Sequence, residues 1–164
     1  MSITSSSAYS GTSAPLGPDG TPFTLRDPLT EARDLLRSAA RLPFHANQPG
    51  AWQAAFRQAV NGARAAIRHH IWVADLPDSP LHQAEELAPR LLPTVDQQRE
   101  EHQVFTQRID ALVAEASAPG QVDIWKMIEL SEQAILLEMA LARHHNRLTQ
   151  LVFETTHRDL GAGD

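Results

Sequence analysis

The sequence predicts an all-α protein folded as an up-down antiparallel four-helix bundle. Apolar residues recur every three or four positions in four long segments, which is the spacing of a single helix face. No segment alternates apolar and polar residues at every second position, as strands do. The connections between the segments are short, so neighbouring helices should run antiparallel.

The first expected helix follows a stretch that has little apolar surface to bury. Residues 1–24 are rich in Ser, Thr, Gly and Pro, and we expect a disordered tail there, with the bundle domain over residues 25–164. Asp27 can cap free backbone N–H groups and Pro28 suits the first helical position, so the first helix should begin here. The segment PFHANQPG, with two prolines and a glycine, should end it.

Three further long helices are expected along the chain. The second should span about residues 51–75 and stop at the breaker LPDSP. Ser79 can start a further helical piece, and Pro89 and Pro93 predict a break before the main part of the third helix, which should continue to about residue 117. After the turn SAPGQVD, the fourth helix should run over about residues 122–158.

Composition excludes several classes of function. Asp and Glu number 20 against 14 Lys and Arg, so the net charge of −6 gives nucleic-acid phosphates no general attraction. No apolar run approaches the roughly 18 residues that a membrane span needs, and the stretch before Arg26 lacks the basic and apolar parts of a secretory signal. We therefore expect a cytoplasmic protein that binds neither nucleic acid nor membrane.

The available side chains also restrict the chemistry. The chain has no cysteine, which leaves His, Asp and Glu as the only side chains suited to bind a metal ion. It contains no phosphate-binding Gly-rich loop, no HExxH or G-x-S-x-G motif, and no nucleophile recognisably placed beside a base. These absences favour a protein that is not an enzyme.

Each of the last three long helices places one histidine on its apolar face. His70 falls on the stripe of the second helix, His102 on that of the third and His144 on that of the fourth. The stripe of the third helix is predicted to contain Val95, Arg99, His102, Phe105, Ile109 and Leu112. A single such histidine is more often a core residue with a backbone or water partner. Three of them, each costing about 1–3 kcal/mol if unpaired, are better explained by a shared iron, manganese or zinc ion.

Four carboxylates are candidate additional ligands, although each could instead be solvated or salt-bridged. Asp75 lies five residues after His70, about half a turn from its face, and Glu101 precedes His102 and points about 100° away. Glu138 and Glu154 flank the stripe of the fourth helix.

The expected levels of the histidines along the bundle do not agree well. Measured from the turn at 118–121, His144 follows the turn at a greater distance along the chain than His102 precedes it. At the rise of a helix, roughly 1.5 Å per residue, the difference corresponds to about 10 Å. The two rings should therefore sit at different levels unless the fourth helix starts later or contains a bulge; otherwise Glu138 lies closer to the level of His102.

With these residues identified, the chain resembles the hemerythrin-like, HHE cation-binding proteins, in particular a bacterial subfamily of short helical-bundle proteins. The resemblance covers about residues 52–164 and is carried by HIWVADLPDSP, APRLLPTVDQQREEH and RHHNRLTQLVFETTHRDLGAGD. Its most specific part is the C-terminal end, with Leu151, Val152, Phe153, Glu154, Asp159, Gly161, Gly163 and Asp164.

The resemblance implies an up-down four-helix bundle that holds a non-haem iron centre and binds dioxygen or senses oxygen, nitric oxide or iron. By position, His70, His102 and His144 match the ligand histidines of its second, third and fourth helices, and Asp75 stands where the subfamily usually has Glu. The first helix lacks the histidine that fully equipped members have there, and Leu148 stands where an acid would follow His144.

Two interpretations stay open on the sequence. The first is a hemerythrin-like metal-binding protein whose partners are a metal ion and a diatomic gas, with iron at a di-iron or a mononuclear site formed by the three histidines and at least one of the four carboxylates. The alternative is a degenerate, metal-free helical bundle that serves as an interaction module and contacts a protein partner or a second copy of the chain.

Overall fold

The computed structural model describes residues 27–45 and 47–157, and this part of the chain contains five α-helices, one 3₁₀ turn and no strand. The helices are α1 (Pro28–Ala40), α2 (Pro49–Ala74), α3 (Pro80–Leu87), α4 (Leu92–Ala116) and α5 (Ile124–His157), and the 3₁₀ turn η1 spans Pro89–Leu91. The all-α prediction is confirmed. The tail expected over residues 1–24 lies outside the described residues, as does the end of the resemblance, residues 158–164.

Local chemistry explains where the helices begin. The Asp27 carboxylate accepts a hydrogen bond from the Thr30 backbone N–H at 2.9 Å, and Pro28 follows at the first position of α1. The Ser79 hydroxyl accepts from the His82 N–H at 3.3 Å and caps α3 in the same way. Both starts agree with the prediction.

The predicted break before the main part of the third helix is confirmed, since α3 and η1 precede α4. Proline lacks a backbone N–H and clashes with the preceding turn, so Pro89 cannot continue α3. The chain instead passes through Ala88, whose φ of −138° is not helical, and through η1 before α4 begins. Between α4 and α5, Gly120 adopts a φ of 108°, a conformation that favours glycine.

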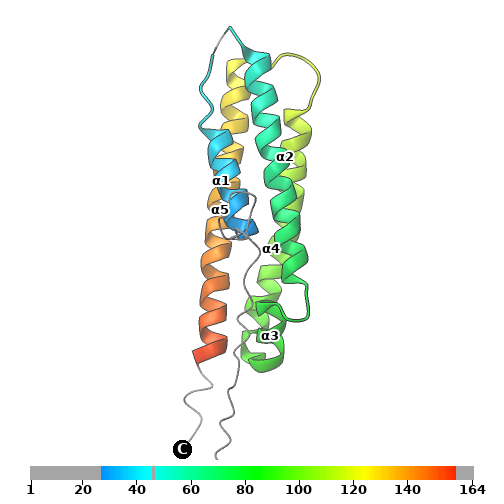
Figure 1. Ribbon diagram of the computed structural model, residues 1–164, viewed down its shortest axis with the longest axis vertical. Coiled ribbons are helices and arrows are strands. Elements are labelled where there is room, and N and C mark those ends of the chain that lie inside the picture. The colour runs from blue at the N-terminus through cyan, green and yellow to red at the C-terminus, as the bar shows by residue number, and fades with distance from the viewer. Residues whose placement is uncertain (1–26, 46, 158–164) are drawn as a thin grey trace, which may run out of the picture.

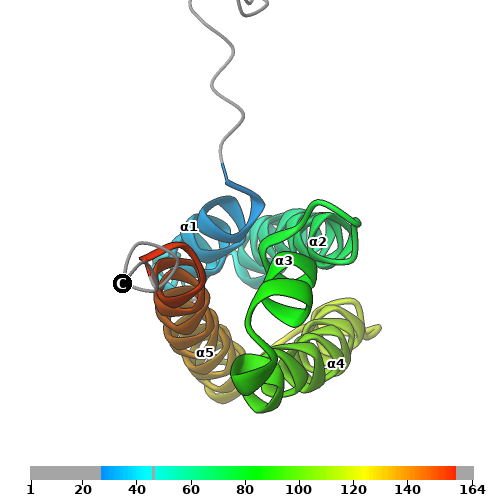
Figure 2. The ribbon, with the colours of Figure 1, turned by 90° about the horizontal axis from the view of Figure 1, so that it is seen from below.

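The helices pack in a fixed order around one interior. Helix α1 packs against α2 and α5, and α4 packs against the same two helices from the other side. Consecutive long helices run in opposite directions, and the short α3 lies across one end, where it contacts α4 and α5 (Figures 1 and 2). Because α1 has only 13 residues, it covers only part of the length of the 34-residue α5.

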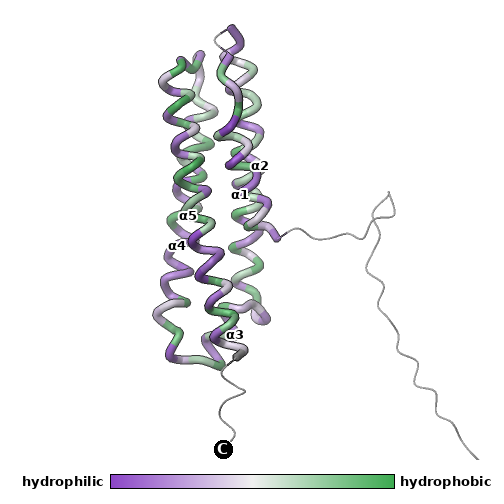
Figure 3. The backbone as a smooth tube through the Cα atoms, turned by 90° about the vertical axis from the view of Figure 1, so that its left-hand side faces the viewer, coloured by the Kyte–Doolittle hydropathy of each residue, from purple (hydrophilic) through white to green (hydrophobic). Residues whose placement is uncertain are grey.

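Hydrophobic and hydrophilic residues alternate along each helix of the described chain (Figure 3). This is the pattern of helices with one buried stripe and one solvated face. None of the described helices combines the length and the apolar character that crossing a membrane requires.

The buried stripe of α4 differs in one position from the prediction. Arg99 was expected on it, but this side chain is 41% exposed and pairs with Glu85 of α3. Gln98 is buried in its place. The spacing of three and four residues can be drawn through either position, and only the packing of α4 on its neighbours selects between them.

We expect Leu36→Ala in α1 to lower the free energy of unfolding by about 2–5 kcal/mol, because Leu36 is fully buried and its loss leaves a cavity. Chemical denaturation followed by circular dichroism measures this change. The control is Leu87→Ala in α3, where the side chain is 63% exposed and the expected change is within about 0.5 kcal/mol. Equal effects of the two substitutions would contradict the described packing.

Candidate metal centre

Three buried histidines from three helices meet in the interior. The Nε2 atom of His144 in α5 lies 3.2 Å from Nε2 of His70 in α2 and 3.2 Å from Nε2 of His102 in α4. The ring centroids are 4.9–5.3 Å apart, and the three side chains have exposed fractions of 7%, 5% and 0% for His70, His102 and His144. The sequence predicted these three residues as ligands, and the fold brings a nitrogen of each within 4.8 Å of the others.

The cluster forms a polar layer between two separate apolar cores. The larger core is built by α1, α2, α4 and α5 and ends at Ile67, Phe105 and Leu141. The smaller core lies around α3 and includes Ala74 and Val95. On its own helix, each histidine thus lies between residues of the larger core and residues of the smaller core. The two cores hold the three helices at fixed positions on either side of the rings.

The predicted difference in level between His102 and His144 is wrong. Along the chain, His102 lies closer to the end of α4 at Ala116 than His144 lies to the start of α5 at Ile124, yet their Nε2 atoms are 3.2 Å apart. The connection after α4 rises past the end of that helix, so α5 begins beyond it (Figure 1). The start of α5 therefore lies about 9 Å beyond the end of α4 along the bundle, at roughly 1.5 Å per residue, and the connection spans this distance.

Glu101 orients His144 from behind. Nδ1 of His144 lies 2.8 Å from a carboxylate oxygen of Glu101, and the other oxygen of Glu101 accepts a hydrogen bond from Arg147. The carboxylate fixes the proton of neutral His144 on Nδ1, which leaves a lone pair on Nε2 facing the other two rings. Histidines that bind metals commonly have this arrangement of a carboxylate behind the imidazole.

All three imidazoles favour the neutral form. Burial, with a contribution from nearby His144, lowers the pKa of His70 to about 4, and burial together with His144 and His70 lowers the pKa of His102 to about 3. Burial also lowers the pKa of His144, against the opposing effect of Glu101. Burial raises the pKa of Glu101, but hydrogen bonds from Arg147 and His144 outweigh it and the net pKa is lowered. Near pH 7 the site therefore holds three neutral imidazoles and one ionised carboxylate, that of Glu101.

The other predicted carboxylates lie away from the ring nitrogens that converge. Glu138 accepts hydrogen bonds from Arg33 at 3.1 Å and from Arg37 at 2.6 Å, and so ties α5 to α1. Asp75 follows the end of α2 with an exposed side chain, and Glu154 is exposed near the end of α5. Glu101 contacts the cluster through Nδ1 of His144, on the side of that ring opposite its Nε2 atom.

Two residues near the cluster were not identified from the sequence. Arg147 lies one turn after His144 and holds Glu101, and an i, i+3 spacing from a candidate ligand was its only signal. Gln98 is a fully buried polar residue four positions before His102. Reading the α4 stripe through residue 98 instead of 99 would have found it.

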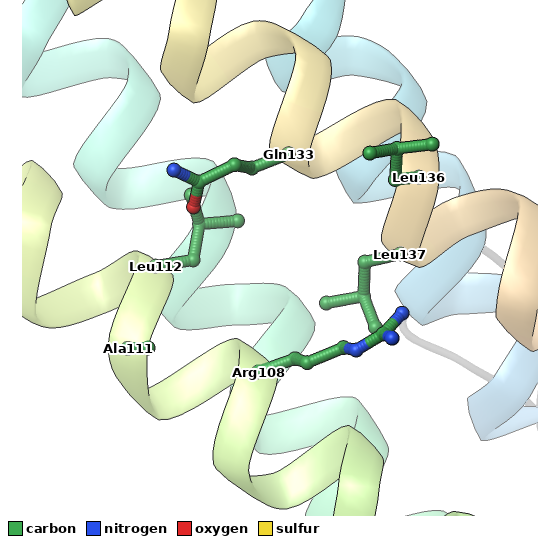
Figure 4. A pocket seen from close by; sticks show the side chains of 6 residues that line it. All are labelled: Arg108, Ala111, Leu112, Gln133, Leu136 and Leu137. Carbon is green, nitrogen blue, oxygen red and sulfur yellow. The ribbon is translucent and has the colours of Figure 1, made fainter.

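Surface grooves run along the seam between α4 and α5. One of about 170 Å³ has Glu101, Phe105 and Arg147 in its wall and so reaches the outer side of the Glu101–His144 pair. Another, of about 250 Å³, lies nearer the α4–α5 connection and is lined mostly by apolar side chains, with Gln133 and Arg108 at its edges (Figure 4). The first groove brings solvent close to the otherwise buried cluster.

The arrangement can offer three nitrogen lone pairs to a single cation. A neutral His144 has one lone pair at Nε2, which cannot accept good hydrogen bonds from both His70 and His102 at once. A cation would receive lone pairs from all three rings and remove this conflict.

Comparisons of the chain with protein-family models, with curated proteins and with solved structures find no match.

We expect metal-free protein to lose stability as the pH falls from about 6.5, the ordinary histidine value, toward the folded-state values of about 4 for His70 and about 3 for His102. In this range the unfolded chain binds protons that the folded chain does not, so the free energy of unfolding must decrease. Denaturation in the presence of chelator at several pH values measures the slope. A His70→Gln, His102→Gln double variant should show a shallower slope, and an equal slope would contradict the assignment.

We expect Glu101→Gln to weaken metal binding about tenfold to hundredfold, because the amide cannot orient and polarise His144 as the carboxylate does. The matched control is Glu138→Gln on α5, which removes the ion pairs with α1 and should leave metal affinity unchanged. Competition with a chromogenic chelator measures both affinities. The reverse order of effects would identify Glu138 as the residue that supports the metal.

Proposed function

We propose that the protein binds one first-row transition-metal ion through Nε2 of His70, His102 and His144. The observation that carries this proposal is the convergence of three buried, neutral imidazoles, in which Nε2 of His144 lies 3.2 Å from Nε2 of each of the other two. Each ring loses its hydration on burial, and an ion compensates all three together. No pairing of the rings among themselves does so.

The spacing of the nitrogens fits such an ion. Imidazole nitrogens bind zinc or similar ions at about 2.0–2.1 Å. Two nitrogens that are 3.2 Å apart then subtend an angle of about 100° at the ion, between the octahedral and the tetrahedral values. Three protein ligands leave at least one position for an external ligand.

A single ion is favoured over a pair. Two-iron centres in helical bundles use several carboxylates projecting inward besides histidines. In the described part of the chain, the His70, His102 and His144 group is the one cluster of this kind, and Glu138 is held by Arg33 and Arg37. Three imidazoles alone suit iron, zinc, copper or nickel. We propose iron, because the resemblance to hemerythrin-like proteins implies it.

We further propose that the chain is a hemerythrin-like four-helix bundle that binds or senses oxygen, nitric oxide or iron. Support comes from the arrangement of α1, α2, α4 and α5 around one interior and from the position of one buried histidine on each of three of these helices (Figure 2).

A metal-free interaction module is the second candidate function. The observation that favours it is a set of exposed apolar side chains along α5, among them Trp125 at 75%, Leu136 at 59% and Met139 at 46% exposure. Leu136 also lines the groove of Figure 4. Exposed apolar patches of this kind can mark protein contacts. A melting temperature that chelator leaves unchanged, together with self-association, would favour this function over metal binding.

We expect the protein to bind about one equivalent of ferrous iron and to melt at a higher temperature with iron than with chelator, because a ligand that binds only the folded state stabilises it. His102→Ala should weaken metal binding by more than about a hundredfold. This exceeds the usual effect of replacing a residue that only hydrogen-bonds to a metal ligand. Anaerobic titration and differential scanning calorimetry measure these quantities.

The matched control for this experiment is His69→Ala. His69 is an exposed neighbour of His70 on α2 and should leave the affinity unchanged. Native protein that binds neither iron nor zinc would refute the proposed metal site. An unchanged affinity of His102→Ala would refute the assigned ligands.

A further inference from the structure

Gln98 of α4 is a buried amide without a partner. Its side chain has no exposed surface, and neither the amide oxygen nor the amide nitrogen has a hydrogen-bond partner in the described part of the chain. Burying an amide without hydrogen bonds destabilises the folded state, because the group loses its hydration without a replacement. A side chain that destabilises the fold, at a position where leucine would fit the stripe, requires another explanation.

The position of Gln98 relates it to the histidine cluster. It lies four residues before His102, so the two side chains share one face of α4 and are neighbours on it. Along this face Val95 belongs to the smaller apolar core and Phe105 to the larger one. Gln98 and His102 therefore lie next to each other on α4, between the residues of this helix that belong to the two cores.

We infer that the Gln98 amide binds the small external ligand held by the metal ion, and this inference rests on the proposed metal site. The three imidazoles supply the ligands of the ion, and the amide of Gln98, next to His102 on α4, is a polar group that no protein atom engages among the residues described. Its partner is then a molecule that enters with the ion. Gln98 is a specificity-determining residue in this scheme and does not itself ligate the metal.

The amide selects a class of ligand. Its oxygen can accept a hydrogen bond from water, and its NH₂ group can donate one to a small anion such as hydroxide or azide. A hydrogen bond to a charged group in a desolvated site is stronger than one between neutral groups. The site should therefore favour small ligands that are anionic or can accept a hydrogen bond over ligands of equal size that cannot.

Cobalt(II) as the metal and sodium azide as the anion test this inference, because the visible spectrum of cobalt(II) responds to each added ligand. We expect Gln98→Leu to bind cobalt(II) within about threefold of the native protein and to bind azide about tenfold to hundredfold more weakly, the loss expected for one hydrogen bond to a charged group. Gln103→Leu, at an exposed position of the same helix, is the matched control and should change neither affinity.

Gln98→Met, which preserves the length of the side chain, is the second variant in case leucine disturbs the packing. Azide affinity that is unchanged in both variants would overturn the inference. A loss of cobalt(II) affinity as large as that of His102→Ala would also overturn it, since Gln98 would then be a metal ligand. Native protein that binds no cobalt(II) would overturn the proposed metal site itself. This result differs from a failure of the Gln98 inference alone, in which the native protein still binds cobalt(II).

A second readout requires no metal. In chelator-treated protein, both Gln98 variants should melt about 2–6 °C higher than the native protein, because they replace an unsatisfied buried amide with an apolar side chain. A lower melting temperature in both variants would mean that the amide has a partner within the fold, which would overturn the inference.

Discussion

Desolvation of three facing imidazoles is the constraint on which the interior of this protein depends. A neutral imidazole has one donor and one acceptor nitrogen, and the ring of His144 uses its donor on Glu101. Its remaining lone pair is approached by two other rings at 3.2 Å. The rings cannot all satisfy one another, so the cluster makes physical sense as a receptor for a cation, and its neighbours can be understood by how they serve it.

The two apolar cores give the cluster its precision. The larger core fixes the spacing of α1, α2, α4 and α5, and the smaller core packs α3 between the ends of α4 and α5. Ligands carried by rigid helices are held more accurately than ligands carried by loops. Helix α1 begins at the level of the cluster, as the 3.8 Å approach of Asp27 to His145 shows, and its arginines hold Glu138.

Stability is given up locally at this layer. Glu101 is kept ionised by Arg147 and His144, while Gln98 has no partner among the described residues. An apolar layer of the same volume would stabilise the metal-free fold more, because each polar group here must be removed from water. Local conflicts between polarity and burial are typical of functional sites, where binding has been retained at the cost of stability.

The helices and the identity of the three buried histidines could be predicted from the sequence. Capping residues such as Asp27 and Ser79, the prolines and the repeat of apolar positions act locally, so they can be read from neighbouring residues. The stripe positions of His70, His102 and His144 follow from the same periodicity. Periodicity could not choose between Gln98 and Arg99, because either fits the spacing.

The way in which these helices meet could not be predicted from the sequence and follows from their packing in three dimensions. The stagger of α5 past α4 depends on the path of the connection at 117–123. It brings together rings that residue counts from the turn at 118–121 predicted to lie about 10 Å apart. The roles of the carboxylates were decided in the same way: Glu138 faces the arginines of α1, and Glu101 lies behind His144. Contacts between residues far apart in the sequence depend on the relative placement of whole helices, and no local pattern encodes that placement.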